Sequence, residues 1–198
     1  MTLNKKNSNG IRRRRMLQVA AGAAMAPGLL AAANAQPSPS PTKAPLPPGK
    51  PGDFAFLTGE WRISHRRLKD AAKDEWDTFT GEATCWGILG GIGSIEELRI
   101  PARNFSGMGV RLLDVESKVW NDFWVNAKFG ILSTPGLTGS FENGVGTFIA
   151  EDVIDGKPFI SRGVWDRITK TSCRWHQASS KDGGKTWQPD WFMDWVRA

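Results

Sequence analysis

Two adjacent carboxylates, Glu96 and Glu97, are the clearest candidates for acid–base or ligand-binding chemistry in this chain. Aliphatic residues flank the pair, so in an extended strand one of the two must point to the interior. An inward carboxylate needs a partner, and Arg67, Arg111 and Arg162 occupy strand-like positions that could supply one. The pattern predicts a buried ion pair that either fills the interior or holds the polar group of a ligand.

Histidine is scarce, with only His65 and His176 in the whole chain. His65 follows Trp61 and Ile63 at a spacing of two, which predicts an inward side chain. His176 should point opposite to Cys173 and Trp175 and therefore share a face with Arg174. His65 is therefore either a hydrogen-bonded core residue or a candidate general base. Compact spacing of three or four ligands is absent, so the sequence predicts no metal site and no cofactor.

The two cysteines, Cys85 and Cys173, lie in separate alternating segments. An early and a late strand of a barrel can be neighbours, and a disulfide would form if their Cα atoms lay within about 7 Å. The alternative is a pair of buried thiols that act as small hydrophobes. We favour the buried thiols.

In the segment from Trp120 to Asn126, neither face is clearly the apolar one, because aromatic residues occur on both faces. If Trp124 and Asn126 point inward, they provide a stacking surface beside an amide that both donates and accepts hydrogen bonds. If they point outward, they form an aromatic stripe for a partner. Parity alone does not decide between these faces.

Near the C-terminus, residues 180–187 read Ser-Lys-Asp-Gly-Gly-Lys-Thr-Trp, which fits an Asp-box turn. Asp182 can accept hydrogen bonds from nearby backbone N–H groups, and Trp187 can pack behind the turn. The pattern occurs once, so we assign both residues a structural role and infer no glycosidase activity from them.

A period of two dominates the region after residue 52, and helical periodicity is nearly absent. Short alternating segments predict half-buried strands. Glycine-rich or Asn-Gly and Asp-Gly clusters separate them and predict tight antiparallel hairpins. The alternating segments lie at 61–65, 79–85, 110–112, 119–125 and 173–177, and the turns at 89–91, 142–144, 154–157 and 181–184.

Strands linked by hairpins, without helical crossovers, favour a β-sandwich or a closed barrel. All ten tryptophans lie after residue 52, and tyrosine is absent. Large rings need an enclosed space in which the indole N–H still finds an acceptor. We therefore predict an all-β fold with a single antiparallel up-and-down β-barrel of about ten strands.

The stretch that leads into the first of these segments, Phe54 to Trp61, reads Phe-Ala-Phe-Leu-Thr-Gly-Glu-Trp and resembles the opening of calycin domains. Together with the Trp-rich C-terminus, it is similar to a bacterial calycin-like (lipocalin-like) domain family of uncharacterised function. The resemblance implies structural roles for Gly59 and Trp61, with the Trp61 ring closing one end of the barrel. It also raises haem as an alternative ligand, with His65 as a single axial ligand, as in nitrobindin-type barrels.

The first 35 residues have the composition of an export signal. Four arginines at 12–15 precede an apolar run that ends in Ala33-Asn34-Ala35, which resembles a twin-arginine signal peptide with cleavage after Ala35. Residues 36–52 form a Pro/Ser-rich linker that should be extended. We expect a folded domain at 53–198, a periplasmic or secreted location, and the twin-arginine export machinery as a partner.

Charge excludes one class of function. Six of the 26 basic residues lie in the first 35 residues, which contain none of the 20 acidic ones, so the remaining chain has no net charge. A neutral domain gives no reason to expect a nucleic-acid partner.

These observations predict an exported barrel that binds a small, mostly apolar or aromatic molecule. The candidate ligand-binding residues are His65, Arg67, Glu96, Arg111, Trp124 and Asn126. Two alternatives remain open: a small isomerase or hydrolase that uses a Glu or His in the same cavity, and a filled barrel with a structural role. The sequence leaves the enzymatic question and the oligomeric state undecided.

Overall fold

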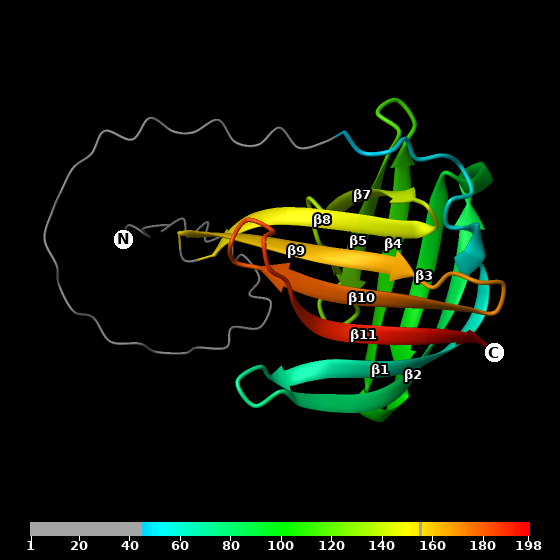
Figure 1. Ribbon diagram of the computed structural model, residues 1–198. Coiled ribbons are helices and arrows are strands. Elements are labelled where there is room, and N and C mark those ends of the chain that lie inside the picture. Colours follow the sequence, from blue (N-terminus) through cyan, green and yellow to red (C-terminus); the bar gives the residue numbers. More distant parts are fainter. Residues whose placement is uncertain (1–44, 155) are drawn as a thin grey trace, which may run out of the picture. The chain divides into compact units, whose positions relative to one another are not determined.

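The computed structural model describes residues 45–154 and 156–198, which form an all-β antiparallel barrel (Figure 1). The predicted signal peptide and most of the predicted linker lie outside the described residues. The strands are β1 (Gly59–Asp70), β2 (Glu75–Ile88), β3 (Gly93–Ile100), β4 (Phe105–Asp114), β5 (Val119–Asn126), β6 (Ile131–Leu132), β7 (Leu137–Glu142), β8 (Val145–Ile154), β9 (Lys157–Asp166), β10 (Ser172–Ser180) and β11 (Gln188–Arg197).

Ten of these strands close into a single up-and-down barrel, as the sequence predicts. Almost every strand pairs with its neighbours in the chain, and β1 pairs with β11 to complete the ring (Figure 1). The short strand β6 pairs only with the last two residues of β5, whereas β7 pairs with its first residues. The topology follows from the local turn signals, since hairpins place consecutive strands side by side.

The predicted turns lie between the strands. Asn143 and Gly144 join β7 to β8 with φ values of 50° and 79°, the left-handed pair that a two-residue type I′ hairpin requires. Three short 3₁₀ turns complete the secondary structure of the described residues: η1 (Ala55–Leu57), η2 (Leu89–Gly91) and η3 (Pro101–Arg103). No helix among the described residues is long and apolar enough to cross a membrane.

One end of the barrel is a packed aromatic core. The largest fully buried side chains are aromatic and point inward from five different strands. They are Trp61, Trp120, Phe148, Trp165 and Trp195. Their rings meet edge to face or tilted, with centroids 5.4 Å apart for Trp165–Trp195 and 5.9 Å apart for Trp61–Trp195. Burial of this much aromatic area makes this end the main source of stability in the barrel.

The segment before β1 plugs this end. Phe54 and Leu57 are buried, and the indole N–H of Trp61 donates to the Leu57 carbonyl at 2.6 Å. Gly49 is also buried: its N–H donates to the Lys118 carbonyl at 2.7 Å. The last residues of the proline-rich segment therefore contact the barrel, and the domain boundary expected at Asp53 stays a prediction.

The buried side of strand β4 includes a charged residue. Leu112 is 38% exposed, whereas Arg111, which was expected to partner an inward carboxylate, is 4% exposed. The inner face of β4 is polar at this level because Arg111 has carboxylate partners inside the barrel. An assignment of the inner face from the apolar residues Val110 and Leu112 alone would therefore be wrong for this strand.

Candidate functional site

The second end of the barrel differs from the packed end in its exposure. Inward side chains there are half-buried, although the register places them on the lumen face. We call this region the open half, because its inward side chains are less buried than those at the packed end. Its aromatic and amide side chains are Phe79, Trp124, Asn126, Trp175, Gln177 and Trp191.

Glycines let two of these tryptophans lie flat on the barrel wall. A Cβ placed on Gly107 would lie 2.7 Å from Cη2 of Trp124, and one on Gly163 would lie 3.2 Å from Nε1 of Trp175. Each ring therefore covers a neighbouring glycine instead of projecting across the lumen. This arrangement presents ring faces to whatever occupies the open half.

The floor of the open half is charged. The guanidinium of Arg111 donates through Nη2 to Oε2 of Glu96, and its Nε lies 3.6 Å from Oδ1 of Asp122. The side chains of Arg111 and Glu96 are each 4% exposed, whereas that of Asp122 is 17% exposed. Asp122 points inward from β5 and is the most exposed side chain of the three.

Electrostatics at the floor follow from one cation between two carboxylates. Burial raises the pKa of Asp122 to about 6, with Arg111 opposing the shift and Glu96 adding to it. The pKa of Arg111 is raised because attraction to Glu96 and Asp122 exceeds the cost of its burial. Arg111 thus stays charged, and Asp122 is the group of this cluster that can take up a proton near neutral pH.

His65 lies on the wall next to the floor and is 2% exposed. Its ring stacks on Phe79 with centroids 4.6 Å apart, and its Nδ1 accepts a hydrogen bond from Nε1 of Trp191 at 3.2 Å. Burial, assisted by the charge of Arg103, lowers its pKa to about 4. His65 is therefore a neutral, hydrogen-bonded wall residue at pH 7.

The geometry around His65 also tests the haem alternative. Its second nitrogen, Nε2, faces the backbone of β2, where a Cβ on Gly81 would lie 2.6 Å away. An axial ligand needs that nitrogen to point into open space. The residues present do not fit haem ligation by His65.

The rim of the open half carries further polar groups. The guanidinium of Arg67 lies 4.7 Å from the ring centroid of Trp191, and Nε2 of Gln177 donates to Oδ2 of Asp190 at 3.2 Å. Burial raises the pKa of Asp190, although the hydrogen bond from Gln177 and the charge of Arg67 oppose the shift. These groups frame the lumen entrance.

The structure brings most of the predicted site residues onto one surface. Glu96 is buried beside Arg111 while Glu97 is exposed, and both Trp124 and Asn126 face the lumen. Arg67 also points inward, but at the rim, so it does not contact the Glu96–Arg111 pair.

Arg162 was wrongly expected to face Glu96. It lies on the outer face of β9, where its guanidinium is 4.0 Å from the ring centroid of Trp187. The turn after β10 covers this part of the outer wall, so burial there does not indicate an inward side chain.

Sequence reasoning missed Asp122. The register pairs it with Arg111, and this pairing is the signal that identifies it. Without that register, the mixed faces of the Trp120–Asn126 segment left its direction open.

The Asp-box turn is held together by hydrogen bonds to Asp182. Asp182 accepts hydrogen bonds from the backbone N–H groups of Lys185 and Thr186 and from the Thr186 hydroxyl, at 2.6 to 3.1 Å. These bonds lower its pKa to about 2.

Both cysteines are free and buried, as favoured from the sequence. Burial raises the pKa of Cys173 to about 12, and it raises that of Cys85 as well. Neither thiol is therefore activated as a nucleophile.

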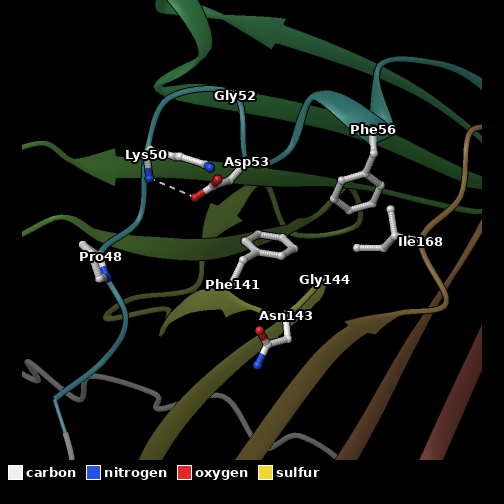
Figure 2. A pocket seen from close by; sticks show the side chains of 9 residues that line it. All are labelled: Pro48, Lys50, Gly52, Asp53, Phe56, Phe141, Asn143, Gly144 and Ile168. Atoms are coloured by element: carbon white, nitrogen blue, oxygen red, sulfur yellow. Dashed lines mark hydrogen bonds between the residues drawn. The ribbon is translucent and has the colours of Figure 1, made fainter.

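Two of the surface hollows formed by the described residues lie outside the lumen. One, of about 470 Å³, lies at the packed end, where Lys50, Asp53, Phe56 and Phe141 are among the residues that line it (Figure 2). Asp53 accepts hydrogen bonds there from the Lys50 backbone N–H and from Nε1 of Trp120, which tie down the plug segment.

The other hollow, of about 430 Å³, lies over the outer face of β1, β2 and β11 beside Ser64 and Thr80. Neither hollow contains the Glu96–Arg111–Asp122 cluster. Within the described residues, no group of three or more His, Cys, Asp or Glu side chains is placed to hold a metal ion.

Comparisons with known proteins add little to this geometry. No family model matches the chain, and no curated protein matches it. Among solved structures, the chain is similar to the crystal structure of Rv2717c from M. tuberculosis, with a TM-score of 0.43 and 12% sequence identity. That match covers 73% of this chain and 94% of the other.

Proposed function

We propose that this protein is an exported barrel that binds a small, mostly apolar or aromatic molecule in the open half of its lumen. One observation carries the proposal: inward tryptophans are half-buried at one end of the barrel and fully buried at the other. Half-exposed aromatic faces around a charged floor are typical of a ligand site, because apolar walls supply affinity and a few polar groups supply orientation. We place the lumen cavity expected from the sequence in this half, because the other half is a packed core.

Binding is favoured over catalysis by the residues first considered as bases. Glu96 accepts a hydrogen bond from Arg111. Neither ring nitrogen of His65 is free to contact a ligand in the lumen, because Nδ1 accepts from Trp191 and Nε2 faces Gly81. A general base must reach the proton it abstracts, and neither group does so in this arrangement. The alternative of an isomerase or hydrolase that depends on Glu96 or His65 therefore has less support.

The test is a titration with N-phenyl-1-naphthylamine, a neutral aromatic probe whose emission rises in apolar surroundings. We expect saturable binding with one probe per chain. Trp175→Ala should weaken it about tenfold, because a central aromatic contact carries much of a binding free energy. The matched control is Trp86→Ala, since Trp86 is 45% exposed on the outer face. An emission change that does not saturate, or that Trp86→Ala reduces equally, would contradict binding in the lumen.

Two further parts of the proposal rest on sequence features. We propose export by the twin-arginine pathway, supported by the arginines at 12–15 and the Ala33-Asn34-Ala35 site. N-terminal sequencing of protein from the periplasm should begin at Gln36, and retention of the intact chain in the cytoplasm would contradict export. We also propose a calycin-like family, supported by the buried Trp61 at the plugged end beneath Arg197.

A further inference from the structure

The outer face of β2 to β6 is apolar, whereas an antiparallel sheet with one face on the core normally turns a polar face to solvent. The register places four large apolar side chains in one row, each opposite the next on the neighbouring strand: Trp86, Ile95, Val110 and Phe123. Because Glu96 beside Ile95 and Arg111 beside Val110 point inward, this row points outward. Trp86 is exposed, and the other three side chains are half-buried.

Two further rows extend the apolar surface along the strands. Toward the open half, the next row consists of Met108, Val125 and Leu132, in register on β4, β5 and β6. Toward the packed end, Ile88 and Leu112 both pair with Gly93, where an added Cβ would lie 2.7 Å from Cγ1 of Ile88 and 3.5 Å from Cδ2 of Leu112. The glycine leaves room for both side chains to lie over β3. We call these three rows the apolar wall.

The opposite side of the barrel has the ordinary polar exterior. The outward side chains of β1 and β11 include Arg62, Ser64, Arg66 and Asp194. Val196 is 56% exposed there, but it lies between Arg62 and Ser172 and belongs to no apolar row. Single exposed apolar residues are normal, whereas a contiguous exposed patch with a polar rim marks a surface that a partner covers.

Shape and charge restrict what covers the apolar wall. Strands β3, β4 and β5 are paired on both sides, so they leave no edge for an added peptide strand. Neither of the two hollows described above lies on the wall, so they provide no groove there for a helix. At the β2–β3 edge, Glu82 and Glu97 each lie 3.0 Å from the guanidinium of Arg99, and this excess of negative charge disfavours an anionic lipid surface. Another sheet face fits, because two sheets pack face to face through apolar side chains.

The two edges of the apolar wall are complementary in charge, which favours a second copy of this chain. Glu97 is exposed at the β3 edge, opposite Met108. Lys128 is exposed at the other edge, two residues after Asn126 at the end of β5. A two-fold axis along β4, between two facing walls, brings the β3 edge of one copy over the β5 edge of the other. Each Glu97 then lies near the partner's Lys128.

The apolar wall has the size that a weak, specific contact needs. Its five strands, about 4.8 Å apart, span about 20 Å, and three rows about 7 Å apart span a similar length with their side chains. With its polar rim, such a face reaches the roughly 600–800 Å² per partner of the smaller specific interfaces. An interface of this size predicts a dimer that dissociates at about micromolar concentration.

We propose that the protein forms a symmetric homodimer in which the apolar walls of two barrels pack face to face. This inference is independent of the ligand proposed for the lumen, because the side chains of the wall point away from the lumen. The dimer removes the exposed apolar rows from water. The contacts between Glu97 and the partner's Lys128 fix the register of one wall on the other.

The first experiment is analytical ultracentrifugation of the full chain at concentrations around the micromolar range. We expect a monomer–dimer equilibrium with a Kd of about 1–10 µM. Leu112→Glu places a charge on the wall and should raise the Kd at least about tenfold. Val196→Glu is the matched control, because it places the same charge on an exposed aliphatic position of the opposite side and should leave the Kd unchanged. A wild-type protein that stays monomeric at about 100 µM, or equal weakening by the two substitutions, would overturn the proposal.

Exchange of the edge charges tests whether the partner is a second copy in this orientation. Glu97→Lys and Lys128→Glu should each raise the Kd by about three- to tenfold, because each brings like charges together at both edges of the interface. The double variant restores opposite charges and should return the Kd to within about twofold of the wild-type value. Losses that add in the double variant would show that the two walls do not face each other, and the homodimer would be wrong.

A vesicle experiment separates a dimer from a wall covered by lipid. In flotation with vesicles of phosphatidylglycerol and phosphatidylethanolamine, we expect the protein to stay unbound. Flotation of the wild type that Leu112→Glu abolishes would assign the wall to a lipid surface and refute the homodimer. Binding of N-phenyl-1-naphthylamine reports on the lumen separately, so the proposed function can stand where this inference fails.

Discussion

The guanidinium of Arg197 lies 4.0 Å from the ring centroid of Trp61, which joins the last strand to the first at the plugged end of the barrel. The same guanidinium donates to the Thr58 carbonyl and, at 2.7 Å, to the Phe56 carbonyl. Arg197 therefore covers the buried indole of Trp61 and, through the same guanidinium, holds the plug segment by hydrogen bonds. A planar cation with several donors is required for both tasks.

Removal of this contact should destabilise the whole barrel. We expect Arg197→Leu to lower the free energy of unfolding by about 2–3 kcal/mol, from three lost hydrogen bonds to the carbonyls of Phe56, Thr58 and Lys170 and one lost cation–π contact. Arg197→Lys should cost less, because it keeps the charge but not the planar fork. Urea denaturation measures both, and an Arg197→Leu protein as stable as the wild type would refute this role.

His65 should make stability depend on pH below neutrality. Burial lowers its pKa to about 4 in the folded protein, against 6.5 without burial. Between these values the unfolded chain binds more protons, so the free energy of unfolding rises with pH and is lost on acidification, by up to about 3 kcal/mol at pH 4.

Only two histidines occur in the chain, so NMR titration of the imidazole resonances resolves His65 directly. We expect one resonance to remain that of a neutral ring down to about pH 4, and to be absent from a His65→Phe protein. Titration of both rings near pH 6.5 would exclude a buried neutral His65.

The two carboxylates around Arg111 should respond differently to amide substitution. Glu96→Gln leaves the buried guanidinium with Asp122 alone, and we expect a loss of about 3 kcal/mol, toward the lower end of the cost of breaking a buried pair. Asp122→Asn should be tolerated, because Glu96 still holds the guanidinium.

The Asp122 substitution also has a defined pH signature. Its folded pKa of about 6 lies above the ordinary value of 3.8, so the stability contributed by its neutral form is complete below 3.8 and is lost as pH rises through 6. The Asp122→Asn protein lacks this loss and should gain on the wild type by about 2–3 kcal/mol between pH 4 and pH 7. Parallel urea curves at these two pH values test this, and a constant difference would contradict the raised pKa.

Gly107 should control the position of Trp124. In Gly107→Ala, the new methyl group overlaps the indole, so the ring must leave the wall, at a cost of about 1–3 kcal/mol. We expect a shift in tryptophan emission and weaker binding of N-phenyl-1-naphthylamine. Gly87→Ala is the control, because its Cβ meets only Oγ1 of Thr58 at 3.5 Å. Identical emission and binding in the two variants would show that the lumen wall does not depend on Gly107.

The sequence predicts the barrel because its signals are local. Asn143-Gly144 and similar turns specify hairpins, and a chain of hairpins specifies the order of the strands. For Glu96 and Glu97, alternation predicts that one side chain points inward, and the structure assigns this to Glu96, which shares its face with the fully buried Leu98. The inward direction of His65 followed likewise from its spacing to Trp61.

The rest of the site depends on contacts between strands, which a single sequence does not encode locally. Asp122 gains its role from Arg111 on the neighbouring strand, and its own segment alternates aromatics on both faces. Arg162 was misassigned because the Asp-box turn buries part of the outer wall under Trp187. Polar interiors and covered exteriors both break the rule that the apolar side faces in.

The pairing of β1 with β11 has a consequence for biosynthesis. Every other partner in the barrel is close in the chain, so those hairpins can form as the polypeptide emerges from the ribosome. The ring, however, cannot seal until residues 191–197 are available to residues 61–67. Until then both terminal strands present unpaired edges, and a chain that is shortened by its last few residues would keep them and aggregate.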